Sequence, residues 1–146
     1  MARSYFSTTI DVPLEEVWAV ARDFNGLATW WSGSVSASQI EDGKTGDTVG
    51  AIRRFTFGTD QIREHQLELS DVSHRCVYEF CEPAPFPVTD YVATLQLTPI
   101  TDGDRCFVEW WADFESEADK LDYWRGFCAS EVFASAVESL RSYLKA

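Results

Sequence analysis

The last quarter of the chain, residues 119–146, carries apolar side chains at helical spacing. Apolar residues that recur every three or four positions fall on one face of an α-helix, and a helix of this length is about 40 Å long. A face this broad needs a concave partner, and the strand-like segments before it are the obvious candidate. Its residues are Leu121, Trp124, Cys128, Val132, Ala136, Val137, Leu140 and Leu144, widened by Phe127, Phe133 and Tyr143.

The beginning of the chain predicts one strand and two short helices. Ser4–Val12 mainly alternates between polar and apolar residues, which is typical of a strand. Pro13 suits the first position of a helix that ends near Arg22, because a missing N–H costs little there. Asp23 is expected to cap a second short helix over Phe24–Ala28, followed by an irregular turn.

Six further strands are expected between the short helices and the long one. They are bounded by turns rich in Gly, Asp and Pro, and their short connections favour an antiparallel meander. No linker divides the chain, so one domain over residues 1–146 is expected. The strands are Val35–Ile40, Thr48–Phe57, Gln61–Leu69, Arg75–Cys81, Thr89–Thr98 and Arg105–Phe114.

Composition and charge narrow the classes of function. The chain is 45% hydrophobic and 14% aromatic, which excludes a disordered chain, and its six Trp and ten Phe suit a cavity for an apolar ligand. The net charge of −12 argues against binding nucleic acid or an anionic membrane surface. No signal peptide and no run of about 20 apolar residues is found, so a soluble cytoplasmic protein without a membrane span is expected.

Metal and cofactor chemistry finds no support in the sequence. There is no phosphate-binding glycine loop, zinc-ligand spacing or nucleophile elbow, so no metal and no cofactor are expected. His65 is expected at the surface, with a role as a base as the alternative, and His74 lies in a turn. Four cysteines are expected to be buried free thiols. They are Cys76, Cys81, Cys106 and Cys128.

Alternation predicts which strand residues face the helix. In the strand Thr48–Phe57 the apolar phase contains Val49, Ala51, Phe55 and Phe57, and it carries Arg53 inward with it. In the last three strands the inward sets are Cys76, Tyr78 and Phe80, then Tyr91, Ala93, Leu95 and Leu97, and finally Cys106, Val108, Trp110, Ala112 and Phe114.

Arg53 is the informative member of these sets. An inward guanidinium needs a partner, because a lone buried charge costs several kcal/mol. Glu64 on the next strand can supply it if a bulge reconciles its direction with that of Leu67 and Leu69. The alternative is a solvated Glu64 and an Arg53 that reaches an edge of the sheet.

Rings and hydroxyls on the inner face are the other candidate ligand contacts. Trp30 and Trp31 form either a lip over the cavity entrance or an anchor for the second short helix. Pro83–Pro87 cannot pair inside a sheet, and is either a gate or a rigid loop. The candidate contacts are Tyr78, Tyr91, Trp110, Phe55, Trp31, Trp124 and Cys128.

The order of strand, two short helices, six strands and long helix resembles the START/SRPBCC superfamily, which includes proteins like the birch pollen allergen. The series Ile10–Trp18, and Asp23–Leu27 with Trp30, look like its polyketide cyclase/dehydrase branch. The resemblance implies an α+β helix-grip fold in a single START/SRPBCC-like domain. In that fold a curved seven-stranded antiparallel sheet surrounds a long C-terminal helix, with two short helices after the first strand.

A shorter series is similar to the lachrymatory factor synthases, which rearrange a small sulfenic acid. It comprises Val49–Arg53, Glu64, Tyr78 and Asp90–Thr94. In those enzymes an arginine and a glutamate form the central polar pair of the pocket, with tyrosines beside them. The resemblance implies that Arg53 and Glu64 are catalytic and that the tyrosines orient the ligand.

The expected function is binding of a small hydrophobic or amphipathic molecule in an internal cavity. The enzyme version is a cofactor-independent cyclase, dehydratase or isomerase that uses Arg53 and Glu64. The alternatives are a non-catalytic carrier or sensor for a lipid or quinone-type molecule, and a protein-interaction module. A monomer and a homodimer are both compatible with the sequence.

Overall fold

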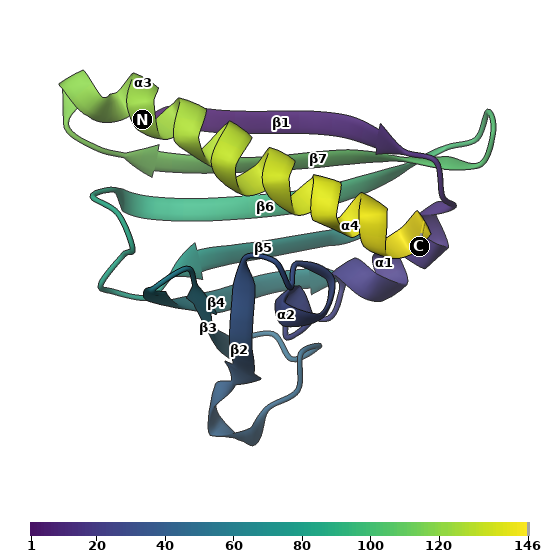
Figure 1. Cartoon of the computed structure of the whole chain (residues 1–146), viewed down its shortest axis with the longest axis horizontal. Helices are drawn as coiled ribbons and strands as arrows, with labels where there is room; N and C mark the ends of the chain where they lie inside the picture. The colour runs from purple at the N-terminus through teal and green to yellow at the C-terminus, as the bar shows by residue number, and fades with distance from the viewer. Residues whose placement is uncertain (146) are drawn as a thin grey trace.

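Seven antiparallel strands form one curved sheet in the order β1-β7-β6-β5-β4-β3-β2 (Figure 1). The computed structural model describes residues 1–145. All seven predicted strands are present, with ends that differ by a few residues. They are β1 (Ala2–Ile10), β2 (Val35–Ile40), β3 (Ile52–Phe57), β4 (Asp60–Ser70), β5 (Arg75–Phe80), β6 (Thr89–Ile100) and β7 (Arg105–Glu115).

The predicted C-terminal helix lies across one face of the sheet (Figure 1). A 3-10 turn, η2 (Ala118–Lys120), leads into α3 (Leu121–Phe127), a π-helical stretch η3 (Cys128–Ala134) and α4 (Ser135–Lys145). Ser4 of β1 is fully buried and its hydroxyl donates to the carbonyl of Arg125 at 2.6 Å, which ties the helix to the edge strand. The last residue of the predicted helix, Ala146, lies outside the described residues.

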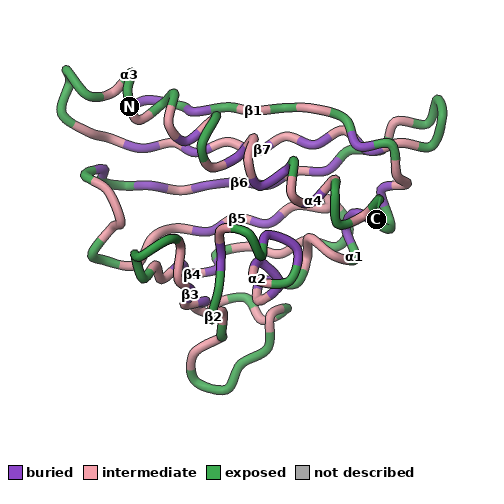
Figure 2. The backbone as a smooth tube through the Cα atoms, viewed as in Figure 1, coloured by how far each residue is buried: buried purple, intermediate pink, exposed green. Residues whose placement is uncertain are grey.

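Burial follows the predicted alternation. Buried residues alternate with less buried ones along β7 (Figure 2), and along residues 91–97 of β6 the one exception is Thr94, which is buried between Ala93 and Leu95. All the predicted inward residues of these two strands are buried, as are Cys76 and Tyr78 of β5, while Phe80 is half-buried. On the helix, Cys128, Phe133, Ala136, Val137 and Leu140 are buried. Tyr143 is exposed, so its assignment to the buried stripe was wrong.

The second short helix begins later than predicted. Helix α1 (Leu14–Ala21) follows Pro13 as expected, but α2 spans Leu27–Trp30 rather than Phe24–Ala28. The side chain of Asp23 accepts from the N–H of Asn25 at 3.0 Å, and therefore closes a local turn instead of capping the helix.

One predicted inward residue of the β3 region is exposed. Val49 is 57% exposed, because Gly50 adopts a positive φ of 92° and β3 begins only at Ile52. The alternation therefore cannot be extended backward through the glycine. Before β3, residues 41–51 form a loop that extends away from the sheet (Figure 1) and includes the 3-10 turn η1 (Glu41–Gly43).

The bulge expected in β4 is present. The pairing of β4 with β5 shifts register between Gln66 and Glu68. Before the shift Glu64 and Gln66 are buried, and after it Leu69 packs against the core while Leu67 is exposed. The extra residue therefore lets Glu64 and Gln66 before the bulge and Leu69 after it use the same inner face, whereas the expected inward direction of Leu67 was wrong.

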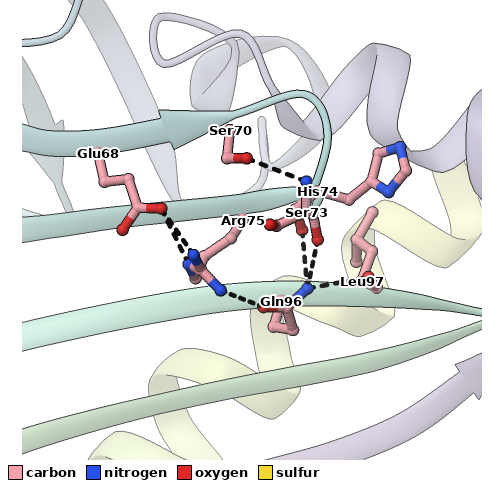
Figure 3. A network of polar contacts seen from close by, with 7 residues as sticks. All are labelled: Glu68, Ser70, Ser73, His74, Arg75, Gln96 and Leu97. Carbon is pink, nitrogen blue, oxygen red and sulfur yellow. Dashed lines mark hydrogen bonds and ion pairs between the residues drawn. The ribbon is translucent and has the colours of Figure 1, made fainter.

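A polar network fixes the β4–β5 turn to β6 (Figure 3). Arg75 donates to Glu68 through Nε at 3.1 Å and Nη2 at 2.8 Å, and to the side-chain oxygen of Gln96 through Nη1 at 3.3 Å. The Gln96 amide donates to the carbonyl of Ser73 at 2.6 Å and that of Leu97 at 3.1 Å. The network joins three strands on the outer part of the molecule.

The four cysteines are free thiols, as predicted, and three of them are buried, whereas Cys81 is only half-buried. Within residues 1–145 no helix is long and apolar enough to cross a membrane.

Candidate ligand-binding cavity

A cavity of about 270 Å³ lies where the sheet meets the helix. Its floor comes from β3, β4, β5, β6 and β7, and its other walls come from α2, the β5–β6 loop, α3 and η3. The lining side chains are mainly aromatic and aliphatic. They are Leu27, Trp31, Arg53, Phe55, Phe57, Asp60, Ile62, Glu64, Tyr78, Phe80, Pro85, Phe86, Tyr91, Trp110, Tyr123, Trp124, Phe127 and Val132.

Arg53 and Glu64 form the predicted ion pair in this wall. They are directly opposite in the β3–β4 ladder, which brings their side chains together on the inner face. Nε and Nη2 of Arg53 lie 2.7 Å and 2.6 Å from Oε1 of Glu64, and the two side chains are only 6% and 8% exposed. The geometric prediction is therefore confirmed, and the role of the pair in binding or catalysis stays a prediction.

Aromatic rings and one carbonyl hold the arginine in place. Its Nη1 donates to the backbone oxygen of Phe24 at 3.2 Å, and its Cζ lies 4.0 Å from the centre of the Phe24 ring and 4.8 Å from that of Tyr78. A planar guanidinium suits such stacking better than an ammonium group does. Gly46 permits this arrangement, since its carbonyl accepts from the N–H of Phe24 and a Cβ at Gly46 would collide with Asp23.

Glu64 is held through one of its two oxygens. The Nε and Nη2 contacts from Arg53 both engage Oε1, whereas no hydrogen bond to Oε2 is found among residues 1–145. Burial raises the pKa of Glu64, and the charge and hydrogen bond of Arg53 oppose that shift. A buried carboxyl group at a cavity wall, with a raised pKa and one oxygen that accepts no hydrogen bond, is a candidate for accepting or donating a proton.

Two tyrosines add hydroxyl groups to the same wall. The indole N–H of Trp110 donates to the hydroxyl oxygen of Tyr78 at 3.0 Å, so the proton of Tyr78 remains for another acceptor. Tyr91 stacks on Phe80, with ring centres 4.0 Å apart. Burial raises the pKa of both tyrosines well above the ordinary value, so both remain protonated donors.

Aromatic residues of the β5–β6 loop and of α3 close the cavity on the helix side. Phe86 stacks on Trp124 with ring centres 4.8 Å apart, and lies edge-on to Phe127 at 5.7 Å. Pro85 also lines the cavity, so the proline-rich loop is part of the wall. Phe86 was missed as a contact because loop residues have no periodicity, whereas Phe127 could have been found three positions after Trp124 on the same helical face.

Most of the remaining residues predicted to contact a ligand line the cavity, and Trp30 does not. Phe55, Trp31, Trp110 and Trp124 line the cavity with the two tyrosines. Trp30 is buried behind Trp31, with ring centres 6.2 Å apart, and does not line it.

Cys128 was wrongly assigned to the cavity. It is buried, burial raises its pKa to about 12, and it is not part of the described wall. His65 is half-exposed beside Glu79 at 3.0 Å and is also outside the wall, which agrees with a surface role. Among residues 1–145 no group of three or more His, Cys, Asp or Glu side chains could hold a metal ion.

The fold and the cavity together define a helix-grip protein of the START/SRPBCC type. Residues 1–144 match the family described as polyketide cyclase / dehydrase and lipid transport, and the chain belongs to this family. None of the curated proteins matches this chain.

Solved structures share the fold over nearly the whole chain. A protein from Thermobifida fusca is 28% identical with a TM-score of 0.85, and the alignment covers 99% of this chain and 93% of that one. A protein from Nitrosospira multiformis is 25% identical with a TM-score of 0.79, covering 98% and 96%. Norcoclaurine synthase from Thalictrum flavum, at 14% identity and a TM-score of 0.78 over 98% and 92%, shows likeness of fold alone.

Proposed function

We propose that this protein binds a small, mainly apolar molecule in the cavity and orients its polar end against Arg53 and Glu64. The observation that carries the proposal is a buried ion pair in the wall of an otherwise apolar cavity. Burying two charges is costly, and replacing such a pair with apolar residues is often neutral or stabilising. A pair retained at a cavity wall is therefore better explained by ligand binding than by stability.

Within this proposal the enzyme version is a cofactor-independent cyclase, dehydratase or isomerase. Arg53 polarises an oxygen of the substrate, and the free Oε2 of Glu64 moves a proton between two atoms of the same molecule. The aromatic walls lower the local dielectric, which strengthens both effects. The family description, which names cyclases and dehydrases, supports this version.

The second candidate is a non-catalytic carrier, and one observation favours it. Arg53 is already engaged by Glu64 and by the carbonyl of Phe24, so it can serve as a fixed anchor rather than a group that responds to a reaction. The family description also names lipid transport. A cavity of about 270 Å³ counts against the third alternative, a protein-interaction module with a filled interior.

Native mass spectrometry of freshly purified protein tests the binding proposal. We expect a bound small molecule in the wild type and its loss in Val132→Phe, which puts a ring into the cavity. Val72→Phe is the matched control, because Val72 is 92% exposed and lies outside the cavity wall. Equal retention of the molecule by both variants would place it elsewhere and contradict the proposal.

The identified molecule then separates the two versions. Glu64→Gln keeps the size of the side chain but removes its capacity to carry a proton. Retained affinity with lost conversion supports the enzyme. Unaltered ligand recovered from wild-type protein after prolonged incubation, with affinity reduced in the variant, supports the carrier.

A further inference from the structure

The charged residues in the cavity wall do not favour binding of an anionic ligand. Among the described residues in its wall, Arg53 is the one basic residue, and Glu64 and Asp60 are the two acidic ones. With these groups ionised, Glu64 offsets the charge of Arg53, and Asp60, which is exposed to solvent at the start of β4, adds one negative charge. The whole chain carries −12, so its long-range field also repels anions.

Arg53 does not offset this repulsion, because it is already paired. Its Nε and Nη2 lie within 2.7 Å of the same oxygen of Glu64. A carboxylate ligand would have to share the guanidinium with Glu64, and two carboxylates at one buried cation leave an uncompensated negative charge. An uncharged oxygen can approach the guanidinium without this cost.

We propose, on the basis of the binding function above, that the ligand of this cavity is an uncharged aromatic ketone, aldehyde or phenol of one or two rings, and that carboxylates are rejected. The polar end is a carbonyl or hydroxyl next to Arg53, Glu64 and Tyr78. The Arg53–Glu64 pair thereby acts as a specificity determinant, since Glu64 cancels the charge that would attract an acid.

Hydrogen bonding agrees with an uncharged polar end. The hydroxyl oxygen of Tyr78 is occupied by Trp110, so its proton is donated to the ligand. No hydrogen bond to Oε2 of Glu64 is found within residues 1–145, so this oxygen can accept from a ligand hydroxyl. A carbonyl uses the first group and a hydroxyl uses both, whereas a carboxylate would set a second acceptor against Oε2.

Cavity size and wall chemistry fix the body of the ligand. A cavity of about 150 Å³ holds benzene, and pockets for drug-sized ligands measure roughly 300 Å³ or more. The present cavity of about 270 Å³ lies between these limits and suits two fused rings. Its aromatic walls, which include Phe55, Trp110 and Trp124, favour a flat body that makes ring contacts.

Isothermal titration calorimetry at neutral pH with two matched probes tests the proposal. The uncharged probe is 2-acetylnaphthalene and the anionic probe is 2-naphthoate, which have the same ring system and nearly the same size. We expect the wild type to bind the ketone at least about tenfold more tightly, in line with the cost of an unpaired charge in a buried site.

Glu64→Gln should change this preference, because it leaves the charge of Arg53 without a counterion. We expect its affinity for 2-naphthoate to rise about tenfold over that of the wild type. Glu68→Gln is the control, since it makes the same substitution on the same strand outside the cavity wall and should leave both affinities unchanged. Circular dichroism checks that each variant is folded.

The outcomes separate this inference from the function on which it rests. Wild-type protein that binds 2-naphthoate as tightly as the ketone would overturn the inference and leave the binding function intact. Failure of the wild type to bind either probe, together with no co-purified molecule in native mass spectrometry, would overturn both. The wild-type comparison decides the preference for uncharged ligands even if Glu64→Gln does not fold.

Discussion

Two arginine–glutamate pairs connect neighbouring strands of this sheet, one inside the cavity and one on the outside. Nη2 of Arg53 lies 2.6 Å from Glu64, and Nη2 of Arg75 lies 2.8 Å from Glu68. The distances are nearly equal, but the inner side chains are 6% and 8% exposed and the outer ones 36% and 42%. Water therefore screens one pair and not the other.

This difference in burial shows that the distance between two charged groups does not indicate how much the protein's stability depends on their pairing. The outer pair belongs to the network that joins the β4–β5 turn to β6 (Figure 3), and water can replace each of its partners. In the part of the chain that the structure describes, the two inner side chains contact each other, the carbonyl of Phe24 and the surrounding rings. Removing one partner of the outer pair should therefore change the stability of the protein little, whereas removing one partner of the inner pair should lower it strongly.

Replacing either arginine alone should give the largest difference in stability between the two pairs. We expect Arg53→Met to lower the free energy of unfolding at neutral pH by about 3–5 kcal/mol, because it leaves Glu64 buried without a counterion. Arg75→Met should lower it by at most about 1 kcal/mol. Urea denaturation measures both, and equal losses would show that burial does not distinguish the pairs.

Removing both inner partners should restore stability. The double variant Arg53→Met, Glu64→Met contains no unpaired buried charge, and we expect it to be about 2 kcal/mol more stable than Arg53→Met alone. The matched outer variant Arg75→Met, Glu68→Met should show no such recovery. A double inner variant as unstable as the single one would mean that the cost comes from lost packing.

The pH dependence of stability isolates Glu64. Because its pKa in the folded protein is raised above the ordinary 4.5, it favours the folded state most below that value. This contribution is lost as the pH rises through the folded-state pKa, by about 1.4 kcal/mol for each pH unit between the two pKa values. The stability of the wild type relative to Glu64→Gln should therefore fall over this window.

Glu41 has a pKa shift in the opposite direction, so its effect on stability should depend on pH in the opposite way. Its hydrogen bond with Arg63 lowers its pKa, so the stability it contributes is present above pH 4.5 and is lost as the pH falls through its folded-state pKa. Denaturation of Glu64→Gln and Glu41→Gln across the acidic range should give slopes of opposite sign relative to the wild type. Slopes of the same sign would contradict the assigned burial of Glu64.

The smallest expected effect is the dependence of the coupling energy of each pair on salt concentration. A double-mutant cycle on Arg75 and Glu68 should lose a few tenths of a kcal/mol of coupling between low and high ionic strength, since exposed pairs are screened. The same cycle on Arg53 and Glu64 should be nearly independent of salt. Salt dependence of equal size in both cycles would indicate that water reaches the inner pair.

The fold and the inner pair were predictable because both follow from simple periods. Strand alternation placed Arg53 inward, and the pairing of β3 with β4 then left Glu64 as its neighbour. Helical spacing found the long helix. The same rules failed where the period is interrupted, as at Val49, which is separated from β3 by Gly50.

The rest of the cavity wall depends on features without a local pattern. The π-helical stretch η3 changes the rotation of the helix after Phe127, so spacing alone could not decide that Val132 lines the cavity and Cys128 does not. Phe86 reaches the wall from a loop, and Asp60 from the first position of β4, directly after a turn. Contacts of this kind are set by tertiary packing rather than by sequence periodicity.

The tryptophan side chains allow the most direct test of ligand binding at this cavity. Trp31, Trp110 and Trp124 lie in its wall, whereas Trp18 and Trp111 lie outside it. In a titration of ¹⁵N-labelled protein with 2-acetylnaphthalene, we expect the indole N–H signals of the first three to shift and those of the other two to stay in place. Shifts confined to Trp18 and Trp111, or no shifts at all at saturating probe, would contradict a ligand site between the sheet and the helix.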